Sequence, residues 1–444
     1  MLFRQFVDDD LGCCSYLVGD EQAGVAAIVD PAYRIEPYLD EARRHGVVIS
    51  RVLETHTHAD HVSGHGRLAL EHGATVAIHP AAAPEYPFEP LVDGGEIELG
   101  DVAVRVVHTP GHRPEHCAFA VVDRARASEP WLVLSGDSLF VGDAARPDLA
   151  VEPGEGAEGL FHSLQRLTAL ADGVELFPGH VAGSLCGAAM SSKPSSTIGY
   201  ERRFNRALLV PELGEFVAEL AGSLPPRPPN MDRIVALNRG PFLGAPQPLE
   251  PIGHAPADAI VLDVRPARDF AGGHVAAALN VPLDGGSFAT KAGFVLDVDV
   301  PVALHASSAA DAERAAHGLR SVGFLQLAGR LDEPATPARL AVVELDQLDA
   351  LLNAGEVEVL DVREPDEYEL VSIPGTRNVP YRLVREDRPG DRPVVTICET
   401  GARAAIAASV LAAEGVDARP VLSGGVSAWQ ARRREAVPLR RPGS

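Results

Sequence analysis

In the stretch Thr55-His56-Thr57-His58-Ala59-Asp60-His61, three histidines and one aspartate lie close together. Each of its three imidazoles and its carboxylate would need a hydrogen-bond partner if it were buried in a core. Side chains two residues apart point the same way from an extended segment, so we expect His56 and His58 to converge on one point. A metal ion explains such a cluster most simply, and the sequence therefore predicts a metal site.

The residues around this stretch predict where it lies in the fold. Residues 47–53 are typical of a short buried strand, and a helical pattern begins at residues 64–70. The metal-type residues therefore lie on a loop at the carboxyl end of a strand, where layered α/β folds place functional groups.

Three later strands end in the same way, with one metal-type residue behind a tight turn. The strands predicted at 102–107, 131–135 and 174–177 lead to Thr109-Pro110-Gly111-His112, Gly136-Asp137-Ser138 and Pro178-Gly179-His180. One such residue would be weak evidence, because a single His or Asp in a turn is usually an ordinary surface group. Three of them, added to the opening stretch, strongly indicate a metal centre. Further strands are predicted at 25–29, 75–78 and 96–99, with a helix at 36–45.

On these residues, the segment 1–240 resembles the metallo-β-lactamase superfamily, an αββα sandwich whose signature is H-x-H-x-D-H followed by single His, Asp and His ligands. All seven positions are occupied. The resemblance implies one of two centres. The first is a dinuclear zinc hydrolase similar to glyoxalase II, in which Asp137 bridges two Zn²⁺ ions that activate a water molecule.

The second possible centre is that of a persulfide dioxygenase with one Fe(II) per chain. The metal ligands of that family correspond to His56, His112 and Asp137 in this sequence. Two histidines and one carboxylate leave one face of the iron open for a sulfur substrate and O₂. His58, Asp60, His61 and His180 would then surround the ligands rather than bind the metal. The ligand residues alone leave both alternatives open.

Two further stretches resemble the dioxygenases, namely residues 136–149 and 178–200. The stretch 178–200 is similar to the form of the enzyme that is fused to rhodanese domains. Nearby side chains that could contact a thiol substrate are Tyr200, Arg202, Arg203 and Cys186. Solvated surface groups and a small buried hydrophobe are the plainer interpretations of these four residues.

Composition excludes several classes of partner. The 444 residues carry 39 basic and 62 acidic side chains, a formal charge of -23, which repels nucleic acid and anionic membranes. The N-terminal stretch is not typical of a signal peptide, so we expect a cytoplasmic protein, and we also expect a homo-oligomer. Five scattered cysteines predict free thiols rather than a disulfide framework, with structural roles for Cys13, Cys14 and Cys117.

A proline-rich segment, residues 241–256, predicts an extended linker, and beyond it the sequence repeats at a spacing of 98 residues. Leu262-Asp263-Val264-Arg265 corresponds to Leu360-Asp361-Val362-Arg363, and Asn280-Val281-Pro282 corresponds to Asn378-Val379-Pro380. The pattern of strands and helices predicts two small α/β domains with central parallel sheets, at residues 257–335 and 340–440.

Both repeats resemble rhodanese, a sulfurtransferase domain whose active loop begins with cysteine at a strand end. In the second repeat the loop is Cys398-Glu399-Thr400-Gly401-Ala402-Arg403. Loop amides and the start of the following helix can stabilise a thiolate and a persulfide on Cys398, while Arg403 anchors the loop and adds positive charge. In the first repeat Ala306 takes the place of the cysteine and Asp311 that of the arginine, so this domain is expected to lack transferase activity.

The order of the domains favours the iron alternative, because a sulfur-carrying domain fits beside one that oxidises sulfane sulfur. The resemblance implies oxidation of a low-molecular-weight thiol persulfide by O₂ to thiol and sulfite, with Cys398 exchanging sulfur among persulfide, sulfite and thiosulfate, in sulfide detoxification. The alternative is a zinc thioester hydrolase of glyoxalase II type with rhodanese modules used for interaction.

Overall fold

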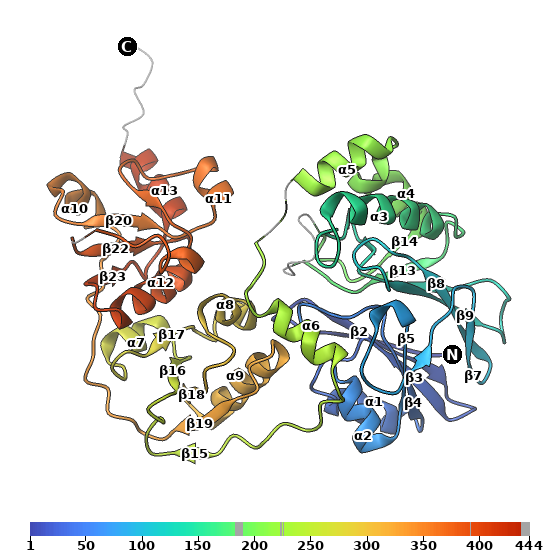
Figure 1. The fold of residues 1–444 in the computed structure, drawn as a ribbon. Coiled ribbons are helices and arrows are strands. Elements are labelled where there is room, and N and C mark those ends of the chain that lie inside the picture. The colour runs from blue at the N-terminus through green and yellow to red at the C-terminus, as the bar shows by residue number, and fades with distance from the viewer. Residues whose placement is uncertain (183–189, 223, 225, 391, 437–444) are drawn as a thin grey trace, which may run out of the picture. The chain divides into compact units, whose positions relative to one another are not determined.

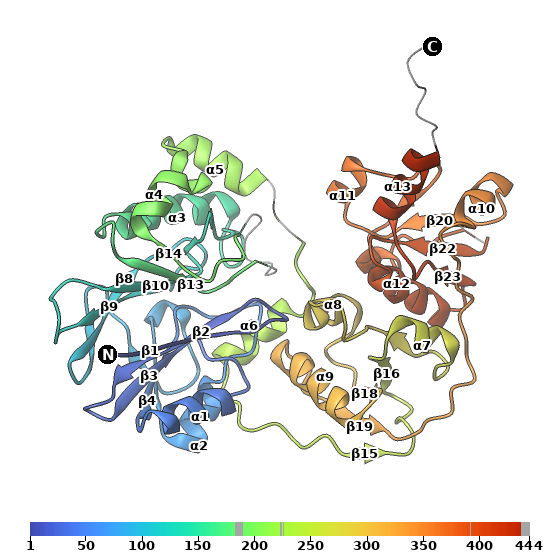
Figure 2. The ribbon, with the colours of Figure 1, turned by 180° about the vertical axis from the view of Figure 1, so that it is seen from behind.

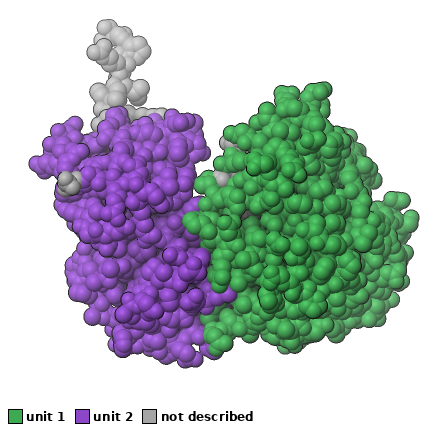
Figure 3. All heavy atoms as spheres, in the orientation of Figure 1, with its two compact units in different colours: residues 1–247, 320–323 green, residues 248–319, 324–444 purple. Residues whose placement is uncertain are grey.

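The computed structural model describes residues 1–182, 190–222, 224, 226–390 and 392–436. The chain divides into two compact units (Figure 3). One comprises residues 1–247 with 320–323, and the other comprises residues 248–319 with 324–444.

The first unit contains two six-stranded sheets. The first sheet has the order β1 (Leu2–Val7), β2 (Cys14–Asp20), β3 (Val25–Val29), β4 (Val48–Leu53), β5 (Thr75–Ile78), β6 (Glu89–Pro90). The second has the order β14 (Ser196–Thr197), β13 (Glu175–Pro178), β10 (Leu132–Gly136), β9 (Cys117–Asp123), β8 (Val102–His108), β7 (Glu96–Leu99). A separate ribbon pairs β11 (Leu139–Phe140) with β12 (Asp143–Ala144).

Helices cover the outer face of each sheet, giving four layers (Figures 1 and 2). The first sheet packs against α1 (Glu36–Arg44) and α2 (His65–His72), and the second against α3 (Pro153–Thr168), α4 (Ile198–Phe204) and α5 (Leu213–Gly222). The unit also contains α6 (Met231–Arg239) and the 3-10 turns η1 (Pro80–Ala82) and η2 (Arg206–Leu209). This is the αββα arrangement predicted from the sequence.

Strand β2 shows why the layers form, since all seven of its residues are buried. Tyr16 and Val18 join the core between the sheets, whereas Leu17 joins the core beneath α1 and α2. Successive side chains of a strand point to opposite faces, so a strand that is apolar on both faces requires a layer on each side.

The second unit contains two parallel sheets. The first has the order β15 (Pro251–Ile252), β19 (Leu327–Leu331), β18 (Val302–His305), β16 (Ile260–Asp263), β17 (Leu279–Asn280). The second has the order β21 (Arg377–Asn378), β20 (Glu358–Asp361), β22 (Val394–Ile397), β23 (Ala418–Pro420). Apart from β15, the two sheets have the same strand order.

The helices of the second unit also fall into two sets. The first sheet is accompanied by α7 (Ala267–Gly272), α8 (Phe288–Val295) and α9 (Ala309–Ser321), and the second by α10 (Leu348–Ala354), α11 (Pro365–Leu370), α12 (Ala402–Ala413) and α13 (Val426–Ala436), with the 3-10 turn η3 (Tyr381–Leu383). The two sets are connected, because the backbone N–H of Asn280 in β17 donates to Ser409 Oγ in α12 at 2.9 Å.

The segment predicted as a linker, residues 241–256, is partly built into these units. Phe242 stacks on Tyr86 within the first unit, with ring centroids 4.6 Å apart. Pro251–Ile252 forms β15 and pairs with β19 in the second unit. Among the described residues, none of the helices has the length and apolar character needed to cross a bilayer.

Candidate functional sites

The histidine-rich stretch lies on a loop between β4 and α2, as the sequence predicts, and its three imidazoles are all buried. The segment contains no strand, however. His56 and His58 belong to two different groups of ligand-type atoms, so they do not share the point that their spacing would allow. The two rings lie next to each other, with centroids 4.3 Å apart, but they face different partners.

His56, His112 and Asp137 form one buried group, with one ligand-type atom from each lying within 4.8 Å of the others. The tautomer of His56 follows from its hydrogen bonds. The hydroxyl of Thr55 donates its only proton to Asp30 Oδ2 at 2.8 Å, so Thr55 Oγ1 must accept from His56 Nδ1–H, also at 2.8 Å. The lone pair of His56 is thereby left on Nε2.

His112 is oriented in the same way. Its Nδ1–H donates to the carbonyl oxygen of Arg146 at 2.9 Å, and a carbonyl can only accept. The free lone pair is on Nε2, which lies 3.6 Å from Asp137 Oδ2. Burial lowers the pKa values of both His112 and His56, so both rings are neutral.

These three residues fit a metal ion. Among the described residues, the buried side-chain atoms without a hydrogen-bond partner include His56 Nε2 and Asp137 Oδ2, and also both ring nitrogens of His58 and His61 Nε2. Such atoms are costly unless something else binds them. Two imidazole lone pairs and one carboxylate oxygen converge there. This donor set suits a divalent transition metal and leaves further coordination positions open.

His116 supports the carboxylate of this group. Its Nε2 accepts the backbone N–H of Asp137 at 2.9 Å, and its Nδ1 bonds Thr109 Oγ1 at 2.8 Å. Burial, together with the nearby ring of His112, lowers the pKa of His116 to about 3, so the ring is neutral and can accept that N–H. His116 therefore fixes the backbone that presents Asp137.

His180 is held between two carboxylates. Its Nδ1 lies 2.8 Å from Asp137 Oδ1, and its Nε2 lies 2.7 Å from Asp60 Oδ2. Burial opposes the charged form, but Asp137 and Asp60 together raise the pKa of His180 to about 10. Both ring nitrogens therefore face carboxylate oxygens at hydrogen-bond distance. His180 in turn holds the pKa of the buried Asp137 below its usual range.

His58 faces two other buried carboxylates. Its Nε2 lies 3.2 Å from Asp30 Oδ1 and 3.2 Å from Glu54 Oε2. Burial alone would lower the pKa of His58, but these carboxylates raise it well above its usual range. The remaining members of the stretch, Asp60 and His61, lie against each other, with His61 Nδ1 3.3 Å from Asp60 Oδ1.

Sequence reasoning missed four residues of this site. Asp30 and Glu54 directly follow β3 and β4. These strands are parallel and pair Val29 with Leu53, so the positions of Asp30 and Glu54 at two strand ends could have identified them. His116 offered no signal beyond its nearness to His112. Cys13, expected to be structural, instead donates from Sγ to Asp60 Oδ2 at 3.1 Å and lies at the edge of the site.

The proposed substrate-contacting residues have different positions. Tyr200 is 57% exposed on α4, and Arg203 is exposed. Arg202 pairs with Asp172 and donates to backbone carbonyls at the end of α3, so its guanidinium is engaged on that surface. Cys186 lies outside the described residues.

The other buried cysteines behave as expected. Burial raises the pKa of Cys14 and of Cys117 to about 12, which makes both thiols poor nucleophiles.

In the second unit, Cys398 lies directly after β22 at the start of a tight loop. Its side chain is buried, and Sγ accepts the backbone N–H of Gly401 at 3.1 Å. Gly401 has φ +99°, a left-handed conformation that glycine adopts without strain, and it caps the twelve-residue helix α12. The thiol thus lies where loop amides and a helix start can stabilise a sulfur anion.

The arginine of this loop anchors it to the domain. Arg403 grips both carboxylate oxygens of Glu367 at 2.5 and 2.8 Å, which ties α12 to α11. Glu399 Oε2 lies 4.0 Å from Arg363 Nη1.

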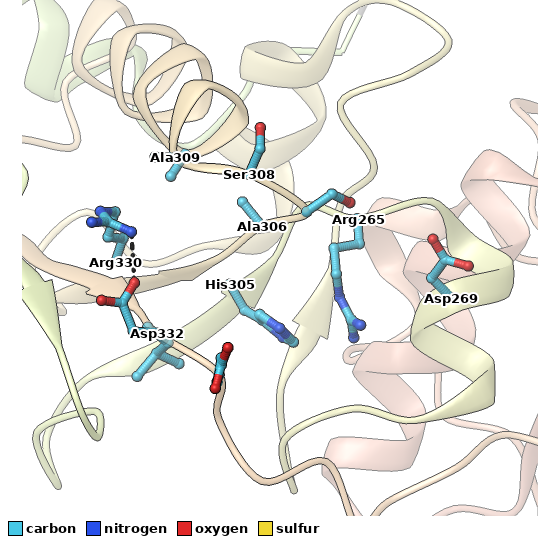
Figure 4. A pocket seen from close by; sticks show the side chains of 12 residues that line it. Arg265, Asp269, His305, Ala306, Ser308, Ala309, Arg330 and Asp332 are labelled. Atoms are coloured by element: carbon cyan, nitrogen blue, oxygen red, sulfur yellow. Dashed lines mark hydrogen bonds and ion pairs between the residues drawn. The ribbon is translucent and has the colours of Figure 1, made fainter.

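At the matching place in the first repeat, after β18, there is a pocket of about 470 Å³. Figure 4 shows Ala306 and Ser308 on one side of it and His305, Arg330 and Asp332 around it, with Arg330 and Asp332 joined by an ion pair of 2.6 Å. Ala306 offers only a methyl group.

Comparison with known proteins agrees with this architecture. The family model "Metallo-beta-lactamase superfamily" matches residues 8–180, and the model "Rhodanese-like domain" matches residues 344–432. An uncharacterized protein of Mycobacterium leprae is 32% identical over 235 residues, which span 46% of this chain and 97% of that protein. A hydroxyacylglutathione hydrolase of Rhizobium etli is 32% identical over 166 residues, 37% of this chain and 60% of that enzyme.

Among solved structures, a metallo-beta-lactamase from Staphylococcus aureus is similar to this chain with a TM-score of 0.70 and 30% sequence identity. The match covers 74% of this chain and 98% of that one. With the αββα layers and the histidine-rich loop between its strands, the chain belongs to the metallo-beta-lactamase superfamily and carries a rhodanese-like domain near its C-terminus.

Proposed function

We propose that the first unit is a persulfide dioxygenase that holds one Fe(II) through His56, His112 and Asp137. The observation that carries the proposal is the division of the metal-type residues. Two imidazole lone pairs and one carboxylate oxygen converge. His180 is hydrogen-bonded to Asp137 and Asp60, and His58 Nε2 lies 3.2 Å from each of two other carboxylates. Two histidines and one carboxylate form the ligand set typical of non-heme iron oxygenases.

The reaction is oxidation of a low-molecular-weight thiol persulfide, RSSH + O₂ + H₂O → RSH + H₂SO₃, in which the terminal sulfur is oxidised and O₂ is reduced. Fe(II), when bound, supplies the redox centre for this chemistry. The protein's own contribution is orientation. Thr55, the carbonyl of Arg146 and His116 hold the three ligand residues in place, as supporting groups around metal ligands commonly do.

In the same proposal, Cys398 carries sulfane sulfur in the C-terminal rhodanese domain. A persulfide on Cys398 that meets sulfite gives thiosulfate and regenerates the thiol, Cys–SSH + SO₃²⁻ → Cys–SH + S₂O₃²⁻. The buried thiol at a helix start and the N–H of Gly401 support this role. We propose that the first repeat, residues 257–335, is a silent copy, because it has the same strand order but Ala306 in place of the thiol. Together, the two activities would remove persulfides that derive from sulfide.

An oxygen electrode tests the dioxygenase directly. Iron-loaded protein given a thiol persulfide should consume O₂, with about one iron per chain by elemental analysis. His56→Ala should abolish both iron binding and O₂ uptake, because it removes one of three ligands. His72→Ala changes an exposed histidine at the end of α2 and should alter neither. Absence of O₂ uptake by iron-replete protein would refute the proposal.

Another candidate is a dinuclear zinc thioester hydrolase, which is favoured by the similarity to the hydroxyacylglutathione hydrolase of Rhizobium etli and by the presence of all seven motif residues. About two zinc ions per chain and hydrolysis of a glutathione thioester would support this candidate. Both results would count against the iron site, because a second metal needs His180 and Asp60 to part from each other.

A further inference from the structure

His58, the second histidine of the motif, lies beside two buried carboxylates that belong to Asp30 and Glu54. The oxygens of Asp30 and Glu54 and a ring nitrogen of His58 form a group of their own, within 4.8 Å of one another, separate from the group of His56, His112 and Asp137. Exposure of the three side chains is only 2 to 4%. His58 therefore lies in a buried cluster with two carboxylates.

The fold produces this cluster directly. Strands β3 and β4 are parallel neighbours, and their last paired residues are Val29 and Leu53. The next residue of each strand is acidic, so Asp30 and Glu54 emerge side by side at the carboxyl edge of the sheet, where the loop begins.

Both carboxylates are fixed in place by other bonds. Asp30 accepts the backbone N–H of Thr55 at 2.7 Å and its hydroxyl at 2.8 Å. Glu54 accepts through Oε1 from Ser63 Oγ at 2.5 Å and contacts His65 Nδ1 at 3.1 Å. His58 Nε2 lies 3.2 Å from Asp30 Oδ1 and 3.2 Å from Glu54 Oε2, so these two fixed carboxylates set the position of its ring.

From this geometry we propose that Asp30 and Glu54 are metal-selectivity residues, which hold His58 away from the metal and so keep the ligand set at two histidines and one carboxylate. The proposal rests on the iron site proposed above. With His58 free to turn, the centre would gain a third imidazole, a donor set that favours tetrahedral Zn²⁺ over Fe(II) with open positions.

The test uses the full-length protein with Glu54→Gln. Asp30 is left unchanged, because it holds the Thr55 hydroxyl that orients His56. A glutamine keeps an oxygen for Ser63 and His65 but replaces Oε2, which faces His58, with an amide nitrogen. The expected result is a rise in Zn²⁺ affinity of about tenfold, measured by competition with a coloured chelator. A purely structural role would lower metal affinity instead.

Two comparisons make the result specific. Adding His58→Ala to Glu54→Gln should cancel the gain, because the gain requires the released imidazole. Glu115→Gln removes another buried carboxylate near the loop, which pairs with Arg113 at 2.7 Å and does not contact His58, and it should give no gain.

The visible spectrum of the Co²⁺-substituted protein is a further readout. The unchanged chain should give the weak bands of a six-coordinate ion, and Glu54→Gln should give the stronger bands of a four- or five-coordinate one. Unchanged zinc affinity and unchanged cobalt bands in Glu54→Gln would overturn the inference, even if the iron-loaded native protein consumes O₂. Conversely, a failure to consume O₂ would remove the dioxygenase while leaving the role of Glu54 intact.

Discussion

The two repeats of the second unit share a strand order and differ at the end of one strand. In the second repeat β22 leads to Cys398, whose sulfur accepts the N–H of Gly401. In the first repeat β18 leads to Ala306 and an open pocket of about 470 Å³. The same strand order thus occurs once with a thiol at the strand end and once with a methyl group there.

The two repeats also share a set of hydrogen bonds at the end of one strand. Arg265 grips Asp263, and Arg363 grips Asp361, in each case two residues apart at the end of the central strand. Asn280 and Asn378 each donate to two carbonyls of that same strand end. These bonds hold the sheet edge in shape whether or not a nucleophile is present.

The largest expected effect comes from removing the thiol. Cys398→Ser should lower thiosulfate-dependent sulfur transfer at least about 10³-fold, because a hydroxyl does not carry sulfane sulfur. Thiocyanate formation from thiosulfate and cyanide measures this. Ala306→Ser places the same hydroxyl in the first repeat and should leave the rate unchanged. A transfer rate that survives Cys398→Ser would assign the activity elsewhere in the chain.

Gly401→Ala should have the next largest effect. The residue has φ +99°, and a Cβ there would lie 3.0 Å from Leu422 Cα and O. We expect a destabilisation of about 1–2 kcal/mol and a slower sulfur transfer, because the N–H that faces Cys398 must shift. Gly415→Ala is the matched control, since Gly415 has φ +87° but a Cβ there would meet nothing within 4 Å. Equal losses of transfer rate in the two variants would show that the loop contact is unimportant.

Loss of Arg403, which anchors the Cys398 loop, should have a smaller effect on stability and sulfur transfer. Arg403→Ala removes a two-pronged bond to Glu367 on a partly exposed surface, and we expect a stability loss of about 1 kcal/mol with a moderate fall in transfer rate. Thermal unfolding and the same thiocyanate assay measure both. Arg419→Ala breaks a more exposed pair with Asp417 and should change neither by a comparable amount.

The smallest expected effect concerns the pH dependence of stability in the first repeat. Burial opposes the charged form of Asp263, but His305 and Arg265 lower its pKa below the ordinary 3.8. A carboxyl group with a lowered folded-state pKa stabilises the fold above the ordinary value, and this contribution is lost as the pH falls through the lowered one. The second repeat has Ile397 in place of His305 and so lacks this ion pair.

Hydrogen exchange of peptides from residues 257–335 in the full chain measures this contribution. Protection there should fall below pH 3.8, by less than about 1 kcal/mol, and Asp263→Asn should flatten the dependence. His305→Ala should weaken the dependence, because it removes one of the two positive partners of Asp263. A pH dependence unchanged by His305→Ala would contradict the role given to His305.

Much of the fold could be predicted from hydrophobic patterns. The strands predicted at 25–29, 75–78 and 96–99 have the bounds that the structure gives, and others agree within one or two residues. Short buried strands between turn residues are local features, which is why the pattern was sufficient. The tight turns before His112, Asp137 and His180 likewise predicted that these residues face one site.

The roles within that site could not be predicted in the same way. Spacing suggested that His56 and His58 share one target, but the loop turns His58 toward Asp30, which is 28 residues earlier and directly follows another strand. The pairing of His180 with Asp137 and Asp60 also joins distant segments. Such contacts depend on strand register and burial, which no local spacing contains.

The sequence by itself determined the layered fold, the metal-type residues and the thiol at a strand end, because these depend on local patterns of polarity and turn residues. The tertiary structure decided which side chains have a free lone pair. That choice depends on the partner buried beside each imidazole: a hydroxyl for His56, a carbonyl for His112, and pairs of carboxylates for His58 and His180.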